Sequence, residues 1–221
     1  MNSPFTQAMP THVETENAPV RKRPKPGERR IQILQVLAQM LENPKGERVT
    51  TAALAARLEV SEAALYRHFA SKAQMFEGLI AFIEQTVFGL INQITEREES
   101  GDRQAHEILM VLLGFAEKNP GMTRVLLGDA LLMEDDRLSD RIAQIFERIE
   151  VSLKQSLRIA QTQGRLPQSA DSNDVSARAA MMMSYVVGRW HRYARSGFKK
   201  LPLEQGDLPM RVLFAVLALV S

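Results

Sequence analysis

The sequence predicts an all-α fold of about nine helices, with three short helices at the N-terminal end and a larger helical body behind them. Apolar residues recur with the helical period of about 3.6 residues in nearly every segment after residue 28. No segment shows the alternation of apolar and polar residues that is typical of a half-buried strand. Hydrophobic residues make up 45% of the 221 positions, which is enough for a packed core.

The composition narrows the class of protein. The chain has no cysteine, so disulfides and thiolate metal sites do not hold it together, and a reducing cytoplasm is the expected compartment. The longest apolar stretch, Val212 to Val220, is about half of the roughly 20 residues that a membrane span needs. The N-terminus lacks the charged and then apolar order of a signal peptide. We therefore expect a cytoplasmic protein with no membrane partner.

Positive charge is concentrated in one quarter of the chain. Residues 21–72 carry eleven Lys and Arg against five Glu, a net charge of +6, whereas residues 1–20 and residues 73–221 each carry −2. The whole chain has a net charge of only +2, so the distribution is more informative than the total.

The chain divides into an arm, a small module and a body. Residues 1–27 hold five prolines and end in a basic run, so we expect a flexible basic arm that either touches a partner or is only a solvated tail. Residues 28–73 form the small module, whose first helix begins at Glu28 and ends at the break Asn43-Pro44-Lys45-Gly46. Residues 74–221 form the body.

Two short helices are expected within residues 50–69. Thr50 or Thr51 can cap the first of them, and Ser61 can cap the second. The joint between them falls at Leu58-Glu59-Val60.

Two short helices joined by a tight turn are the arrangement that places a helix in the major groove of DNA. Small residues at the start of the second helix let its backbone approach base edges, and polar side chains nearby can bind phosphates. The candidate DNA contacts are Thr50, Thr51, Ser61, Glu62, Ala63, Ala64, Tyr66, Arg67, His68 and Lys72. Spacing alone is moderate evidence, because paired amphipathic helices occur in many helical proteins.

The segment from Leu65 to Lys72, preceded by Val60 and Ser61, resembles the TetR family of helix-turn-helix proteins. The resemblance is specific to residues 29–80, and it implies a homodimer that binds double-stranded DNA. Glu59 departs from the family, which usually has glycine at this position. The resemblance therefore implies a left-handed backbone at Glu59, which costs a residue other than glycine roughly 1 kcal/mol. We expect the turn to be retained with slight strain.

The body resembles the nucleoid occlusion factors of that family, from Leu112 to Leu126 and from Asp136 to Glu150. Together with the first segment, the resemblance covers residues 28–160 well and the remainder weakly. It implies dimers on palindromic chromosomal sites, either single or in a higher-order assembly on DNA, that inhibit assembly of the division GTPase FtsZ over the nucleoid.

The same resemblance implies that the C-terminal tail of FtsZ binds between the helix after the DNA module and the next helix. The matching positions are Phe82, Val111, Gly114, Lys118 and Asn119. Lys118 suits an acidic tail, and Gly114 allows close approach of a backbone. Each also has a plainer reading, with Phe82 in the core, Gly114 packing two helices and Lys118 solvated. Leu90 departs from the family pattern, which can have arginine there.

The body is expected to contain a long helix and five more. Their ranges are about 71–95, 105–118, 120–132, 138–161, 173–196 and 207–220, with a charged loop at 96–104. The last two carry more apolar residues than one small body needs, which predicts a four-helix dimer interface. The run Met181-Met182-Met183 belongs to that interface or the core, or alternatively lines a ligand pocket.

Nothing in the sequence indicates an enzyme or a cofactor. The four histidines show no metal-binding spacing, and no glycine-rich phosphate loop or nucleophile motif is present. The alternative function is a transcriptional repressor of the TetR type, with the same DNA module and a hollow body that a small molecule occupies to release DNA.

Overall fold

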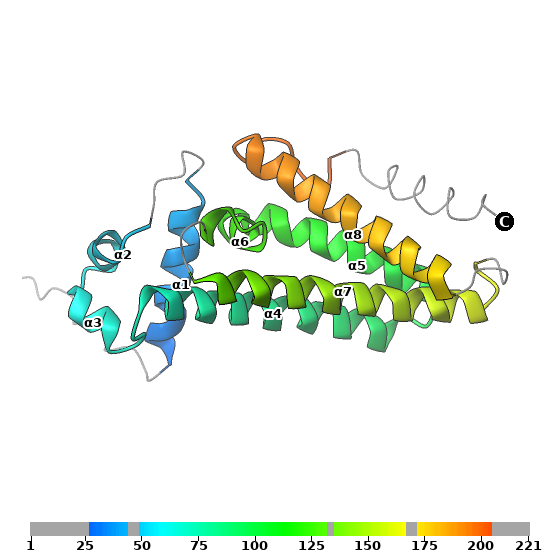
Figure 1. Ribbon diagram of the computed structural model, residues 1–221, viewed down its shortest axis with the longest axis horizontal. Coiled ribbons are helices and arrows are strands. Elements are labelled where there is room, and N and C mark those ends of the chain that lie inside the picture. Colours follow the sequence, from blue (N-terminus) through cyan, green and yellow to red (C-terminus); the bar gives the residue numbers. More distant parts are fainter. Residues whose placement is uncertain (1–26, 44–48, 132–134, 167–171, 205–221) are drawn as a thin grey trace, which may run out of the picture.

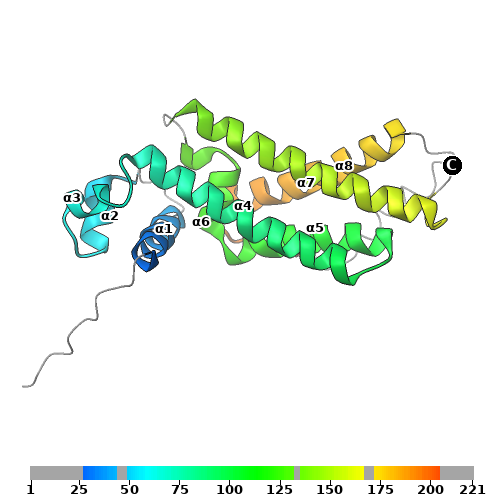
Figure 2. The same cartoon turned by 90° about the horizontal axis from the view of Figure 1, so that it is seen from below.

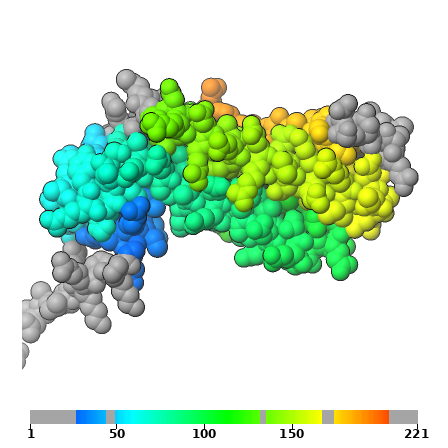
Figure 3. All heavy atoms as spheres, turned by 60° about the horizontal axis from the view of Figure 1, so that its bottom comes forward, coloured from blue at the N-terminus to red at the C-terminus, as the bar shows by residue number. Residues whose placement is uncertain are grey.

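The computed structural model describes residues 27–43, 49–131, 135–166 and 172–204, and every regular element in these ranges is helical. Three helices lie at one end of the elongated molecule, namely α1 (Glu28–Leu41), α2 (Thr51–Arg57) and α3 (Glu62–Tyr66) (Figures 1 and 3). The body contains α4 (Lys72–Arg97), α5 (Gly101–Lys118), α6 (Pro120–Leu126), a 3₁₀ helix η1 (Asp129–Leu131), α7 (Asp136–Thr162) and α8 (Ser172–Arg195). The expected helix at 207–220 and nearly all of the expected arm lie outside the described residues.

Helix α4 connects the two parts of the molecule. It begins at a side-chain cap, in which Ser71 Oγ accepts the Gln74 N–H at 3.1 Å and Gln74 Oε1 accepts the Ala70 N–H at 2.9 Å. One stripe of α4 is buried along its whole length, from Met75 to Ile94. The helix is long and apolar enough to cross a membrane by length and composition, but this stripe packs into the core as in a globular protein.

The body is built in layers. Helix α7 packs along α4 and α5, and α8 packs on α5 and α7 (Figures 1 and 2). Trp190 of α8 is fully buried, and its indole Nε1 donates a hydrogen bond of 3.2 Å to the carbonyl oxygen of Leu112. Its ring centroid lies 6.1 Å from that of Phe146 on α7. One side chain thereby joins three helices.

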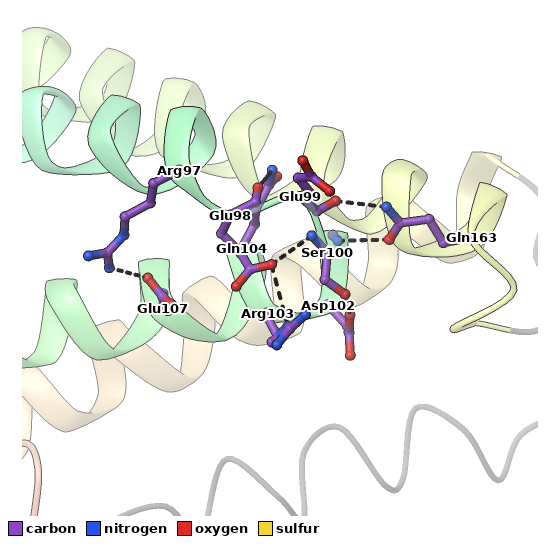
Figure 4. A network of polar contacts seen from close by, with 10 residues as sticks. Arg97, Glu98, Glu99, Ser100, Asp102, Arg103, Gln104, Glu107 and Gln163 are labelled. Carbon is purple, nitrogen blue, oxygen red and sulfur yellow. Dashed lines mark hydrogen bonds and ion pairs between the residues drawn. The ribbon is translucent and has the colours of Figure 1, made fainter.

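The charged loop expected at residues 96–104 is much shorter than predicted. Helix α4 continues to Arg97 and α5 begins at Gly101, so only Glu98, Glu99 and Ser100 separate the two helices. Charged and polar side chains cap the backbone groups of this turn (Figure 4). The Glu98 carboxylate accepts the Ser100 N–H at 2.8 Å, and the side-chain oxygen of Gln163, directly after α7, accepts the Gly101 N–H at 3.0 Å.

Gly101 also shows why α5 starts early. A Cβ atom there would lie 2.2 Å from the carbonyl oxygen of Ser156, so α5 begins in direct backbone contact with α7. The loop at 96–104 was predicted from its charged residues, and charge along the sequence does not reveal that two helix backbones come into contact.

The helix expected at 120–132 was also wrong in length. Helix α6 ends at Leu126, and Gly128 takes a left-handed conformation with φ of 80° before the short helix η1. Glycine adopts this conformation without the steric cost of a side chain, so it ends the helix.

The apolar residues of α8 were assigned to the wrong surface. Val175, Ala179, Met182, Met183, Val186 and Trp190 are all buried within the protomer. They form the core against α5 and α7, so they do not provide the surplus apolar surface from which the dimer interface was predicted. Met181 is the exposed member of the methionine run, with 49% of its surface accessible.

The end of the molecule that contains α1, α2 and α3 is fixed to the body through contacts between α1 and α6. A Cβ atom on Gly121 would lie 2.0 Å from the carbonyl oxygen of Ala38, so the two backbones touch. Arg124 adds two hydrogen bonds of 3.1 Å from its guanidinium to the carbonyl oxygens of Leu41 and Asn43, beyond the last turn of α1. The carbonyls that a helix end leaves unsatisfied are thus bound by the next layer.

Candidate functional site

The two short helices begin at the residues that the sequence predicts. Thr50 Oγ1 accepts the Ala53 N–H at 3.1 Å, and Ser61 Oγ accepts the Ala64 N–H at 3.2 Å. The turn between them places Glu59 at φ of 54°, so the predicted left-handed conformation is confirmed. The helix-turn-helix geometry is therefore retained although the turn lacks glycine.

The amino-terminal ends of α2 and α3 are joined by a side-chain hydrogen bond. Thr51 Oγ1 donates to Glu62 Oε2 at 2.6 Å. Both residues are candidate DNA contacts, and the bond fixes the orientation of the carboxylate. An oriented carboxylate can accept a hydrogen bond from the amino group of cytosine.

The candidate DNA contacts share the outer face of this module. Ser61, Glu62, Ala63, Tyr66 and Arg67 are exposed on α3 and its end, and Thr50 is exposed at the start of α2. Thr51, Ala64, His68 and Lys72 are half-buried. The opposite face of the module packs inward through Leu65 and Phe69, each 1% exposed. One side of α3 thus faces solvent while the other fixes its angle to the body.

Arg30 of α1 binds two residues that follow the end of α3, His68 and Phe69. The Arg30 guanidinium donates a hydrogen bond of 2.6 Å to the carbonyl oxygen of His68 and lies 4.2 Å from the centroid of the Phe69 ring. Sequence analysis missed this residue, because Arg30 lies 38 positions before His68 and has no local pattern that links it to α3.

Much of the basic charge of this region lies outside the described residues. Of the eleven Lys and Arg within 21–72, the structure describes Arg29, Arg30, Arg57, Arg67 and Lys72. The described part of the module therefore supplies geometry and hydrogen-bonding groups more than an excess of charge.

The hydroxyl of Tyr66 offers a clean test of phosphate contact, because the side chain is 45% exposed. Tyr66→Phe removes one hydrogen-bond donor without altering the core, so we expect affinity to fall about three- to tenfold on every duplex sequence. Gel shifts on specific and scrambled sites would measure this. A loss confined to one sequence would instead assign Tyr66 to base recognition.

A groove runs between α4 and α5 on the body. Its volume is about 600 Å³, and residues after α8 contribute one side of it. The lining residues are Thr86, Leu90, Arg97, Glu107, Met110, Val111, Gly114, Phe115, Glu117, Lys118, Asn119 and Leu203. Four of the five candidate partner contacts are among them, namely Val111, Gly114, Lys118 and Asn119.

The fifth candidate, Phe82, lies elsewhere. It is half-buried, packs against the core, and its carbonyl oxygen accepts the Thr86 hydroxyl at 2.8 Å. Thr86 and Leu90 follow it by one and two turns of α4 and line the groove instead.

The charged groups of the groove are mostly engaged. Arg97 and Glu107 form an ion pair across α4 and α5 (Figure 4). Glu117 Oε1 accepts the Leu203 N–H at 2.6 Å. Lys118 forms no ion pair with any residue of the described ranges. The groove therefore combines an apolar surface with one positive and one negative side chain, Lys118 and Glu117, that form no ion pair within the described ranges.

Asn119 has a structural role at the groove's end. Its side-chain amide donates to the carbonyl oxygen of Phe115 at 2.8 Å, and its own carbonyl accepts the hydroxyl of Thr123 at 3.0 Å. It thereby closes the turn between α5 and α6 next to Lys118.

Two pKa shifts lie at the junction between α1 and α8. Burial raises the pKa of Tyr193, and the carboxylates of Glu117 and Glu42 add to the rise. Its neutral phenol donates to the carbonyl oxygen of Glu117 at 3.3 Å. Burial also raises the pKa of Glu42, and Arg57 opposes that rise.

In the described part of the body no metal cluster is present, and the run Met181-Met182-Met183 does not line the groove. No group of three or more His, Cys, Asp or Glu side chains in these ranges has the arrangement of a metal site. Met182 and Met183 are 0% and 6% exposed within the core cluster, so the core reading of the methionine run holds for both.

Family comparisons give the relationships of the chain. Residues 46–79 match the model of bacterial regulatory proteins of the tetR family, and residues 103–217 match the SlmA-like model of the tetracyclin repressor-like C-terminal domain. The nucleoid occlusion factor SlmA of Alteromonas mediterranea is 54% identical over 80% of this chain and 89% of its own length. The protein of the same name from Vibrio cholerae is 49% identical over 81% of this chain and 90% of its own.

The chain belongs to the SlmA family of nucleoid occlusion factors. It is a DNA-binding regulator of the TetR type and not an enzyme. The SlmA-like match continues to residue 217, so the resemblance extends well beyond residue 160, where the sequence motifs became weak.

Solved structures show the TetR fold for this SlmA-family chain. The ketosteroid regulator KstR2 of Mycobacterium tuberculosis aligns with a TM-score of 0.67 at 16% identity, over 86% of this chain and 95% of its own. FadR of Bacillus subtilis, solved with stearoyl-CoA, aligns with a TM-score of 0.66 at 12% identity, over 86% of this chain and 97% of its own. At such identities the likeness concerns the fold alone.

Several groove residues of this SlmA-family chain were missed by sequence analysis. Glu107 and Met110 lie at helical spacing from Gly114 and Lys118, so the face of α5 was open to prediction. Leu203 had no such signal, because it reaches the groove from a turn 86 residues after Glu117.

Proposed function

We propose that this chain binds palindromic chromosomal sites as a dimer and, while bound, inhibits assembly of FtsZ by holding the C-terminal tail of FtsZ in the groove between α4 and α5. The protein would then act at the nucleoid in the cytoplasm and block septum formation there. One observation carries the proposal. Four residues implied by the family resemblance line a single, mostly apolar groove, and one of them, Lys118, forms no ion pair with a residue of the described ranges.

The groove's chemistry suits an extended peptide with apolar and acidic side chains. Leu90, Met110, Val111 and Phe115 offer apolar contact, and Gly114 leaves room for a backbone, since the nearest atom to a Cβ there is Leu203 Cδ1 at 3.7 Å. Lys118 would pair with a carboxylate of the tail. Leu90 occupies a position where members of the family can have arginine. The α4 side of this groove is therefore more apolar than in a member with that arginine.

Dimerisation is part of the proposal because regulators of this family act as dimers on DNA with two-fold symmetry. Two large apolar side chains of the body remain exposed in the protomer, Val151 on α7 at 61% and Met181 on α8 at 49%. An interface that covered them would remove apolar surface from water.

Polymer assembly tests the proposal directly. Genome-wide mapping would first identify a chromosomal site that the chain binds. With the chain bound to DNA of that site, we expect a smaller mass of FtsZ polymer to sediment when purified FtsZ is incubated with GTP. Lys118→Glu should abolish the effect and leave DNA binding intact, because Lys118 lies outside the DNA-binding module. Arg165→Glu, at an exposed position in the turn after α7, makes the same change of charge outside the groove and should leave inhibition unchanged.

Two outcomes would contradict the proposal. Equal polymer mass with and without the DNA-bound protein would show that the chain does not inhibit FtsZ assembly. Release of the DNA site by a small hydrophobic compound at micromolar level would favour a ligand-responsive repressor instead.

A further inference from the structure

The chain after α8 folds back against the groove in a defined turn. Ser196 Oγ accepts the backbone N–H groups of Lys199 and Lys200 at 3.1 and 2.9 Å. A tighter turn follows from Leu201 to Glu204, closed by a hydrogen bond of 3.1 Å from the Glu204 N–H to the Leu201 carbonyl oxygen. Pro202 occupies its second position, where the fixed φ of proline suits the turn.

This turn is held from beneath by a buried arginine. Arg189 is only 8% exposed, and its guanidinium donates to the carbonyl oxygens of Leu201, Pro202 and Glu204 at 2.9, 3.0 and 3.0 Å. Its partners within the described ranges are backbone carbonyls and no carboxylate. Burying a guanidinium is costly unless its donors are satisfied, so the turn and the arginine stabilise each other.

The turn from Leu201 to Glu204 forms one side of the groove. The Leu203 N–H donates to Glu117 Oε1 at 2.6 Å, which fixes the backbone of the turn to α5. The Leu203 side chain lies over Gly114, with Cδ1 at 3.7 Å from the position of a Cβ there, and it lines the groove. Glu117 is also a lining residue, and the same hydrogen bond restrains its carboxylate.

We propose that Leu203 is a contact residue for the peptide bound in this groove and that Arg189 is the positioning residue that holds Leu203 there. The proposal rests on the function proposed above. It adds Leu203 as a third wall of the same groove, whose first two walls are α4 and α5. The occupant is an extended peptide that places an apolar side chain against Leu203 over Gly114 and a carboxylate near Lys118. A wall held by three hydrogen bonds is formed before the peptide arrives, so little ordering is required on binding.

Fluorescence anisotropy with the full chain and a labelled FtsZ C-terminal tail peptide tests this assignment. Leu203→Ala should weaken peptide affinity about fivefold or more, because an apolar contact inside the groove is lost. Leu201→Ala is the matched control, since Leu201 lies two residues away, is 46% exposed and does not line the groove. That variant should bind as the wild type does.

Arg189 is tested with two substitutions and a second readout. Arg189→Met should weaken the peptide about tenfold and speed amide hydrogen exchange at Leu203, and Arg189→Lys should restore part of both, because an ammonium still donates to a carbonyl. Affinity for duplex DNA should stay within about twofold of the wild type in both variants.

The outcomes separate this inference from the proposed function. Failure of the wild-type chain to bind the tail peptide would overturn both. Binding by the wild type together with unchanged affinity in Leu203→Ala would overturn the third wall alone, even if Arg189→Met fails to fold. Faster exchange at Leu203 in Arg189→Met with unchanged peptide affinity would limit Arg189 to a structural role.

Discussion

Trp190→Ala is expected to lower the free energy of unfolding by about 3 to 5 kcal/mol, the largest stability effect that the body offers. Trp190 is fully buried, joins α8 to α5 through its hydrogen bond to Leu112, and packs against Phe146 of α7. Truncation removes a large apolar surface and leaves a cavity between three helices. Urea unfolding followed by far-UV circular dichroism, at one fixed protomer concentration, would measure the loss.

Two further variants make this result specific. Trp190→Phe keeps an aromatic ring and loses the indole donor, so its loss should be smaller than that of the alanine variant. Ile31→Ala removes an apolar side chain that is 48% exposed on α1, so the free energy of unfolding should change by no more than about 0.5 kcal/mol. A loss for Trp190→Ala below about 1 kcal/mol would mean that α8 does not depend on this contact.

Gly121→Ala is expected to lower the free energy of unfolding by about 1 to 3 kcal/mol and to loosen the DNA-binding module from the body. The added Cβ would lie 2.0 Å from the Ala38 carbonyl oxygen and 3.2 Å from the Leu41 Cβ, so α1 must move away from α6. A shift there also strains the hydrogen bonds from Arg124 to the end of α1. Because α1 carries α2 and α3, affinity for specific DNA should fall as well.

The matched control is Gly89→Ala in the middle of α4. A Cβ at Gly89 would meet nothing within 4 Å, so the substitution should raise stability by up to about 1 kcal/mol through helix propensity. Urea unfolding of both variants and gel shifts on a mapped chromosomal site provide the two measurements. A Gly121→Ala protein as stable as the wild type would show that the junction of α1 and α6 is free to relax.

The helix-turn-helix module was predicted well because its signals are local. Cap residues precede each short helix by fixed offsets, and Thr50 and Ser61 accept the backbone N–H groups that such offsets predict. The left-handed conformation at Glu59 was expected because the family usually has glycine at this position of the turn, and the structure shows it. The DNA contacts themselves stay predictions, since exposure on one face of α3 is necessary for contact and not sufficient.

The groove was predicted only where it follows one helix. Gly114 and Lys118 lie on one face of α5, so a family resemblance placed both correctly on the groove. Phe82 shares the helix of Thr86 and Leu90 but packs against the core instead. Which residue of α4 faces the groove depends on how α4 is rotated against α5, and no local pattern encodes that rotation.

The sequence by itself determined the all-helical class, the helix-turn-helix module and the family, because helical period, caps and turn residues act over a few neighbouring positions. Only the tertiary structure decided that the apolar side of α8 is core, that α5 begins at Gly101 against α7, and that Leu203 lines the groove. The physical reason is distance along the chain. The contact between Leu203 and Glu117, 86 positions apart, depends on how whole helices pack. The sequence near either residue has no local pattern that predicts it.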